Sequence, residues 1–309
     1  MQLVSAMDGS KSTWLHADAE SFLKSDMTVN ASFSAAYWTP EITGENARRH
    51  MVVSQGGMPS TVPGAVSEGR HLHSVDLLSG ETVQLTDSAG LPEDEIWSGL
   101  FPSFSADGEF IVFVKGLGLA GKGGASQGAT LWRLPYNGGQ GGVPAPISGA
   151  DLVDELQYYP SLTPDDSYVV YNRVSDSSES GNTNCHPSES TNSNCGAEIW
   201  MIPSGGGDAQ RLDQASGPVG AGFANSWPSM GPNANQEYYW VAFSSLRSYG
   251  VEQMDEDGFS PTPQIWLAAI SKEALSSGGD PSFAPIWLPG QDIEGGNHLA
   301  QWSVARDPE

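Results

Sequence analysis

Residues Gly124–Gly128 (GASQG) are the part of the sequence that most directly suggests catalysis. They match the G-x-S-x-G pattern, in which a serine nucleophile occupies a sharp turn between a strand and a helix. The surrounding residues 116–128 are rich in glycine and show neither that strand nor that helix. We therefore interpret the match as a surface loop, and the sequence identifies no catalytic and no cofactor-binding residue.

Two pairs of residues have the chemistry of metal ligands. His71 and His73 would share one face of a strand, because side chains in a strand alternate with a period of two. Asp255 and Asp257 lie in an acidic stretch that resembles the start of a calcium loop. No third ligand lies near the histidines in sequence, and no glutamate closes the acidic loop. We expect no metal site and no cofactor, with calcium bound at the acidic loop as the alternative.

Both cysteines, Cys185 and Cys195, lie in one polar stretch, residues 180–196. We expect a surface loop closed by a disulfide, because exposed thiols are reactive and a disulfide restricts the unfolded chain. Two free thiols are the alternative, and a zinc site would have only His186 as a further ligand. A disulfide would indicate an oxidising compartment.

The charge of the chain bears on its partners. Thirteen basic residues stand against 37 acidic ones, a net charge of −24. This charge repels nucleic acid phosphates and anionic lipid headgroups, so we expect no nucleic acid partner. We also expect no membrane insertion, since no stretch approaches the roughly 20 apolar residues of a membrane helix. Residues 1–5 lack the features of a signal peptide, so an exported protein would have lost its signal.

A motif of the form aromatic-Pro-Ser-apolar recurs along the chain. It occurs at Phe101–Gly108 (FPSFSADG), Tyr159–Asp166 (YPSLTPDD) and Trp227–Ala234 (WPSMGPNA). Degraded copies occur at Ala31–Ser34 and Ala300–Ser303. The spacing of roughly 60–70 residues is that of a repeat architecture with loops of varying length.

Each copy is followed by the same order of elements: a turn, an apolar strand, a polar loop and a further strand, centred on tryptophan in three of the repeats. Glycine-rich turns and a fourth strand of alternating polarity complete the unit. A short helical turn is expected only at 271–276. The expected second strands are 50–53, 110–114, 168–171 and 238–243, the third strands 71–76, 131–134, 198–202 and 264–267, and the clearest fourth strands 82–86 and 209–212.

These residues resemble the WD40-like (PD40) repeat of TolB-type propellers over roughly residues 31–303. The match is partial: Ala106 replaces a proline, Asp166 replaces a glycine, and Asn233 with Ala234 stands at the turn of the last copy. The resemblance implies an all-β fold, a β-propeller of four-stranded antiparallel blades. Nothing in the chain resembles the additional N-terminal domain of TolB.

We expect a single propeller domain over residues 1–309. Its four complete repeats would span approximately 31–98, 99–156, 157–224 and 225–298, and residues 1–30 and 299–309 would supply partial blade material. A complete ring would then have five or six blades. The alternative, which we favour, is that the chain is a segment of a longer propeller protein.

The predicted function is that of a non-catalytic, periplasmic or extracellular propeller that acts as a scaffold for a protein or peptide partner. The first alternative is a propeller enzyme, either a glycan lyase or a hydrolase, or the accessory propeller of a peptidase, because catalytic residues in propellers can converge from several blades. The second is a calcium-stabilised structural component of an extracellular assembly. The sequence makes no prediction of oligomeric state.

Overall fold

A computed structural model describes the chain at residues 2–4, 11–14, 37–38, 50–55, 71–77, 79–86, 97–117, 129–174, 196–233, 236–249, 262–293 and 295–302. Four predicted features lie outside these residues: the disulfide of Cys185 and Cys195, the calcium candidates Asp255 and Asp257, the serine motif Gly124–Gly128, and the degraded motif Ala31–Ser34.

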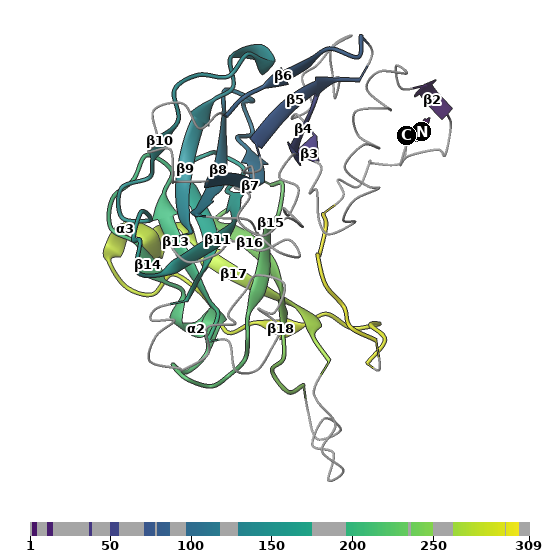
Figure 1. Ribbon diagram of the computed structural model, residues 1–309. Helices are drawn as coiled ribbons and strands as arrows, with labels where there is room; N and C mark the ends of the chain where they lie inside the picture. The colour runs from purple at the N-terminus through teal and green to yellow at the C-terminus, as the bar shows by residue number, and fades with distance from the viewer. Residues whose placement is uncertain are drawn as a thin grey trace, which may run out of the picture. The chain divides into compact units, whose positions relative to one another are not determined.

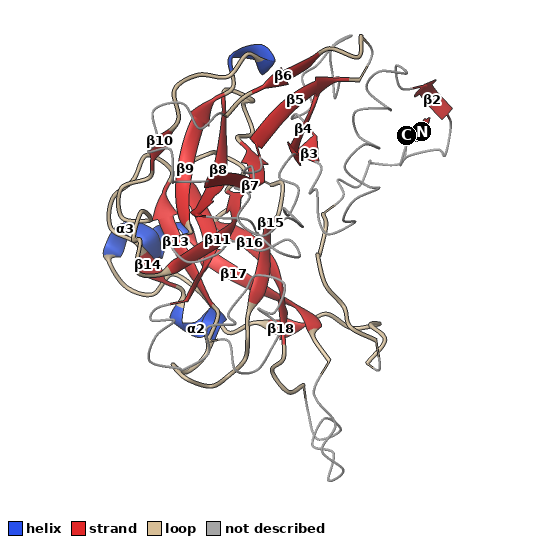
Figure 2. Ribbon diagram, viewed as in Figure 1, coloured by secondary structure: helices blue, strands red, loops and turns tan. Residues whose placement is uncertain are grey.

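Strands dominate the described residues (Figure 2), and they form four four-stranded sheets in which strands adjacent in sequence are adjacent in space (Figure 1). The first sheet contains β3 (Tyr37–Trp38), β4 (His50–Gln55), β5 (His71–Asp76) and β6 (Thr82–Gln84). The second contains β7 (Trp97–Phe104), β8 (Phe110–Leu117), β9 (Thr130–Pro135) and β10 (Ala145–Pro146). The third contains β11 (Leu156–Leu162), β12 (Tyr168–Val174), β13 (Glu198–Pro203) and β14 (Gln210–Arg211). The fourth contains β15 (Ser226–Met230), β16 (Tyr238–Ser245), β17 (Gln264–Ser271) and β18 (Ile286–Trp287).

The remaining elements are short. A separate two-stranded sheet pairs β1 (Gln2–Val4) with β2 (Lys11–Trp14). The described helical elements are the 3₁₀ turn η2 (Asn137–Gly139), α2 (Asp213–Ser216) and α3 (Lys272–Ser277). None of the helices among the described residues has the length and apolar character needed to cross a membrane.

The all-β fold class is confirmed, and the four sheets are blades of the β-propeller type. Each predicted second and third strand falls within an observed strand, and α3 occupies the predicted helical turn. The cause is local patterning: alternating apolar residues favour half-buried strands, and glycine or aspartate turns connect them.

The chain divides into two compact units. The first unit comprises residues 1–126 and 132–145, and the second comprises residues 127–131 and 146–309. In the first unit, the core lies between the facing sides of the first two sheets; its buried members are Val52, Leu72, Leu85, Ile111, Phe113, Leu134 and Tyr136.

The core of the second unit lies between the third and fourth sheets. Alternate residues of the central strands point into it, as the period of two requires. From β12 and β13 it takes Val170, Ile199 and Met201, and from β16 and β17 it takes Tyr239, Val241, Phe243, Trp266, Ala268 and Ile270. Strands that are apolar on both faces, such as β16, are typical of sheets covered on both sides.

Tight turns join the first two strands of the second and third sheets. In the second sheet, Ser105 N–H donates to the Phe110 carbonyl (3.0 Å), and Gly108 adopts a left-handed φ of 75°. Asp166 takes the corresponding place in the third sheet, with a φ of 61°. Aspartate tolerates this region better than most residues, so the replacement of glycine noted in the sequence leaves the turn intact.

Candidate functional site

The repeated aromatic-Pro-Ser motif forms a bulge in the first strand of three sheets. Phe101, Tyr159 and Trp227 have φ values of 50°, 53° and 58°, and the strand register shifts next to each of them. Aromatic residues rarely adopt positive φ, so each bulge is a strained feature held by its surroundings. A bulge redirects side chains. In the second unit the rings of Tyr159 and Trp227 therefore meet edge to face, with 4.7 Å between their centroids.

Asn172 on β12 holds the bulge of the fourth sheet in place. Its side chain is fully buried, and its Oδ1 accepts a hydrogen bond from the Trp227 N–H (3.0 Å). Its Nδ2 donates to the carbonyls of Asn225 (2.8 Å) and Glu198 (3.1 Å). The amide thus satisfies three backbone groups at once and joins the third and fourth sheets.

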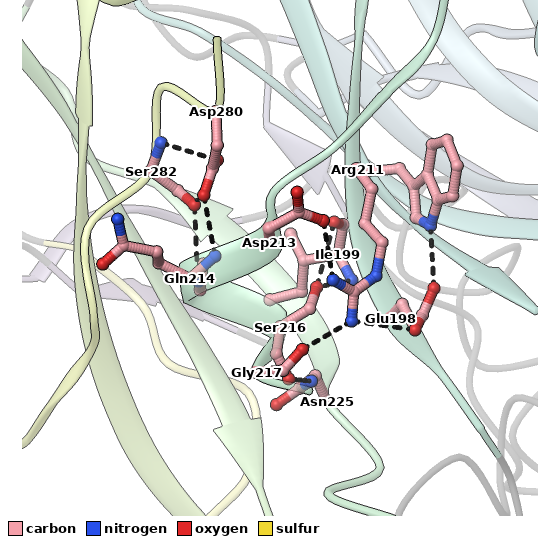
Figure 3. A network of polar contacts seen from close by, with 12 residues as sticks. Glu198, Ile199, Arg211, Asp213, Gln214, Ser216, Gly217, Asn225, Asp280 and Ser282 are labelled. Atoms are coloured by element: carbon pink, nitrogen blue, oxygen red, sulfur yellow. Dashed lines mark hydrogen bonds and ion pairs between the residues drawn. The ribbon is translucent and has the colours of Figure 1, made fainter. Parts of the chain in front are cut away.

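A polar network surrounds α2 in the second unit (Figure 3). Arg211 bridges two carboxylates, Glu198 (2.9 Å) and Asp213 (2.7 Å), and also donates to the Gly217 carbonyl (2.6 Å). Partial burial alone would lower the pKa of Arg211, but the contacts with Glu198 and Asp213 raise it above its usual value. This arginine is therefore a permanent cation whose partners belong to its own sheet and to the adjoining helix.

Residues of the connection between β17 and β18 cap the start of α2. Asp280 accepts from the Gln214 N–H (2.9 Å), and the Ser282 hydroxyl accepts from the Ala215 N–H (3.1 Å), as Figure 3 shows for the Asp280–Gln214 bond. Asp280 also accepts from the Ser282 hydroxyl (2.7 Å). These bonds satisfy N–H groups that a helix start leaves without internal partners. Residues of the fourth sheet thereby stabilise α2, which follows the third sheet in sequence.

Arg247, which follows β16, binds the other end of α2. It is 6% exposed, and its guanidinium donates to the carbonyl of Ala215 (2.7 Å), the Oδ1 of Asn225 (2.6 Å) and the hydroxyl of Ser245 (3.0 Å). Burial lowers its pKa to about 10. The carbonyls at a helix end carry partial negative charge, which favours a cation there. The rings of Phe223, Phe243 and Trp266 surround it.

The first unit contains a cluster of His50, Ser74, Asp76 and Tyr136. The Tyr136 hydroxyl lies 3.0 Å from His50 Nδ1 and 3.0 Å from Ser74 Oγ, and His50 Nε2 lies 3.7 Å from Asp76 Oδ2. A serine, histidine and aspartate are the components of a nucleophilic site. Burial, however, raises the pKa of Tyr136 to about 12, and Ser74 is only 3% exposed. The cluster is suited to cross-linking the first two sheets.

Gly139 closes the cluster of the first unit. A Cβ at this glycine would lie 3.0 Å from Ser74 Oγ and 3.4 Å from His50 Nδ1. Its φ is 94°, so both the space and the backbone conformation require glycine. A side chain at position 139 would therefore crowd Ser74 and His50.

The predicted metal candidates of the first unit lie on β5. His71 and His73 point to the same face, as expected from the strand period, and His73 Nδ1 lies 3.1 Å from the His71 carbonyl oxygen. Burial lowers the pKa of His73, with a smaller contribution from the charge of His71. The described part of the chain contains no group of three or more His, Cys, Asp or Glu residues suited to a metal ion.

Sequence reasoning missed Asn172, Tyr136 and Arg247. Each acts on residues of another strand or another repeat, and no local pattern distinguishes it from other polar residues of its strand or loop. The repeat itself was the one useful signal, since it placed Trp227 and Tyr159 at equivalent positions.

Comparison with known proteins gives no family assignment. No family model matches the chain, and no curated protein matches it. Among solved structures, a putative TolB from Agrobacterium tumefaciens is 14% identical with a TM-score of 0.39, covering 78% of this chain and 62% of that one. An ancestral GH74 enzyme is 11% identical with a TM-score of 0.44, covering 76% of this chain and 25% of that one. A structure from a study of two prolyl endopeptidases is 14% identical with a TM-score of 0.40, covering 92% of this chain and 38% of that one.

The chain thus spans less than two thirds of the length of each of these structures. At such similarity the fold class rests on the strands and their order in this chain. Membership of the TolB-like family stays a prediction from the repeat.

Proposed function

We propose that this chain is a non-catalytic, extracytoplasmic β-propeller scaffold that binds a protein or peptide partner. The observation that carries the proposal is a group of exposed apolar side chains in one stretch of the second unit, residues 286–302. Its members are Ile286 (58% exposed), Leu288 (43%), Ile293 (44%), Leu299 (52%) and Trp302 (39%).

The composition of this stretch is that of an interaction surface. Single exposed apolar residues are ordinary, but grouped ones mark sites of association. Tryptophan is enriched at protein interfaces because it buries a large area at low entropic cost. The charged residues of this stretch are Asp292 and Glu294, and its exposed apolar side chains outnumber them. An apolar partner surface therefore suits it better than a charged one.

The polar clusters also support a scaffold. The bonds of Asn172, Arg211 and Arg247 hold sheets and α2 together in the second unit, and the Tyr136 hydroxyl links two sheets in the first. These groups stabilise the blades, which are the rigid elements on which a binding surface depends.

Affinity capture and reconstitution test this function. The full chain would be immobilised, candidate partners identified, and each purified partner titrated against the chain by calorimetry. We expect a saturable complex that the double substitution Ile286→Ser and Leu288→Ser weakens. Val219→Ser is the matched control, since Val219 is 80% exposed but lies outside the stretch. The proposal is contradicted if the chain binds no purified partner, or if the double substitution leaves the affinity for the partner unchanged.

A further inference from the structure

Residues 297–302 are assigned to no strand, but they share one backbone feature with the first strands of the blades. The degraded motif aligns Leu299 with Phe101, Tyr159 and Trp227, and the φ of Leu299 is 57°, against 50°, 53° and 58° for the other three. Positive φ is rare in residues other than glycine, aspartate and asparagine. Four occurrences at one motif position therefore indicate one repeated backbone conformation.

Contacts place this segment beside β15. The indole N–H of Trp302 donates to the Ser229 carbonyl (2.9 Å), and the rings of His298 and Trp227 lie 6.3 Å apart. The first strands β11 and β15 are neighbours in a similar way: Met230 N–H donates to the hydroxyl of Ser161 (3.0 Å), and the Tyr159 and Trp227 rings meet. Residues 297–302 therefore lie next to β15 in a similar way to that in which β15 lies next to β11.

The segment differs from the other first strands in exposure. Leu299 is 52% exposed and Trp302 is 39% exposed. The equivalents of Leu299 in the second and third sheets, Phe101 and Tyr159, are 6% and 8% exposed, and Met230, the equivalent of Trp302, is 9% exposed. The other first strands pair with a second strand, whereas no strand among the described residues pairs with 297–302.

We propose that residues 297–302 bind an extended strand of a partner polypeptide, which pairs with them antiparallel as the second strand of a further blade. The inference rests on the proposed function and identifies the binding edge and the kind of partner. Strand addition supplies main-chain hydrogen bonds for affinity and side-chain positions for selectivity. It would also cover the exposed side chains of Leu299 and Trp302.

The complete blades indicate the chemistry of the incoming strand. Their second strands are runs of aromatic and β-branched residues, such as Phe110–Val114 (FIVFV) in β8. The register pairs Ser103 with Val112, Ser161 with Val170, and Ser229 with Ala242. Gln301 is the equivalent of these serines, so a small or β-branched residue of the partner would lie opposite it.

The test uses a synthetic peptide with the sequence of residues 109–116 (EFIVFVKG) and two added lysines at each end for solubility. A scrambled peptide with the same lysines controls for attraction to the charge of −24. Titration into the full chain would be followed by tryptophan fluorescence, and amide hydrogen exchange would report on residues 297–302. We expect saturable binding of the ordered peptide alone, together with slowed exchange in this segment.

Three variants make the test specific. Leu299→Pro forces φ to negative values and should weaken binding at least about tenfold. Ala300→Pro restores the residue of the other motifs and should tighten binding by a factor of about two to five, because it preorders the segment. Val219→Ser should change nothing. Thermal melting would verify that each variant is folded, and Trp302→Ser serves as a second weakening variant.

Several results would overturn the inference. One is equal binding of the ordered and scrambled peptides, and another is unchanged binding by the folded Leu299→Pro and Trp302→Ser variants. Exchange at 297–302 that is slow without peptide, at every protein concentration, would mean that another part of the same chain covers the edge. If slow exchange appears only with dimerisation in sedimentation, a second copy covers the edge. A purified native partner whose binding ignores Leu299→Pro would leave the scaffold function standing and remove only this site.

Discussion

Replacement of Asn172 by leucine should destabilise the second unit strongly. The substitution keeps the approximate shape of a fully buried side chain and removes three hydrogen bonds. It leaves the Trp227 N–H and the carbonyls of Asn225 and Glu198 without this partner. A typical hydrogen bond contributes about 1 kcal/mol net, and a buried group left unsatisfied costs about 1–3 kcal/mol. We therefore expect a loss of at least about 3 kcal/mol in the free energy of unfolding.

Urea unfolding of the purified chain, followed by tryptophan fluorescence, would measure the change. A loss of about 3 kcal/mol lowers Tm by roughly 6–12 °C for a unit of this size. Gln140→Leu is the control, because the side chain of Gln140 is exposed. If Asn172→Leu loses less than about 1 kcal/mol, the amide does not hold the bulge as described.

The Asn172→Asp variant tests the direction in which stability changes with pH. An ionised carboxylate could still accept from the Trp227 N–H but would face two carbonyl oxygens, so the pKa of the introduced carboxyl should lie above its ordinary value of about 3.9. A group whose pKa is raised by folding stabilises below its unfolded pKa, and this contribution is lost as pH rises through the folded pKa. Relative to the native chain, this variant should be less stable at neutral pH than under mild acid. A pH-independent difference would refute the geometry around Asn172.

Three further changes have defined outcomes. Arg247→Met should lower the free energy of unfolding by about 3 kcal/mol in urea titrations, because charged donors to Ala215 and Asn225 are lost; an unchanged midpoint would show that the bonds are immaterial. Gly108→Ala should lower the free energy of unfolding by about 1 kcal/mol in urea titrations, because Gly108 has a φ of 75°. Gly205→Ala should be neutral or stabilising, because a Cβ at Gly205 would meet open space. Equal effects of the two substitutions would contradict the turn at Gly108. Burial lowers the pKa of His73 below 6.5, so its contribution to stability is present above pH 6.5 and is lost as pH falls through the folded pKa. His73→Gln should therefore flatten the pH dependence of Tm below pH 6.5, and an unaltered profile would contradict this.

The strands of each blade could be predicted from sequence because the information is local. An apolar run such as 110–114 needs only its own alternation and a flanking turn to favour a strand, and the repeated motif supplies the order in which strands follow one another. The same reasoning placed α3 and the turn at Gly108 correctly.

The candidate site residues could not be predicted in the same way, because a site requires side chains from several segments to meet in space. His71 and His73 share a face of β5 as predicted, but whether a metal binds there depends on ligands from other segments. Spacing within one strand carries no information about such ligands.

What the sequence determined by itself is therefore the repeat, the β-blade and the position of the aromatic-Pro-Ser motif in each blade. Only the tertiary structure decided that Asn172 meets the Trp227 N–H, that Arg247 meets the end of α2, and that Leu299 shares the backbone conformation of the other bulges. The physical reason is the range of the interactions. Strand and turn preferences act between neighbouring residues, whereas a buried polar group finds its partner across the gap between sheets, tens of residues away along the chain.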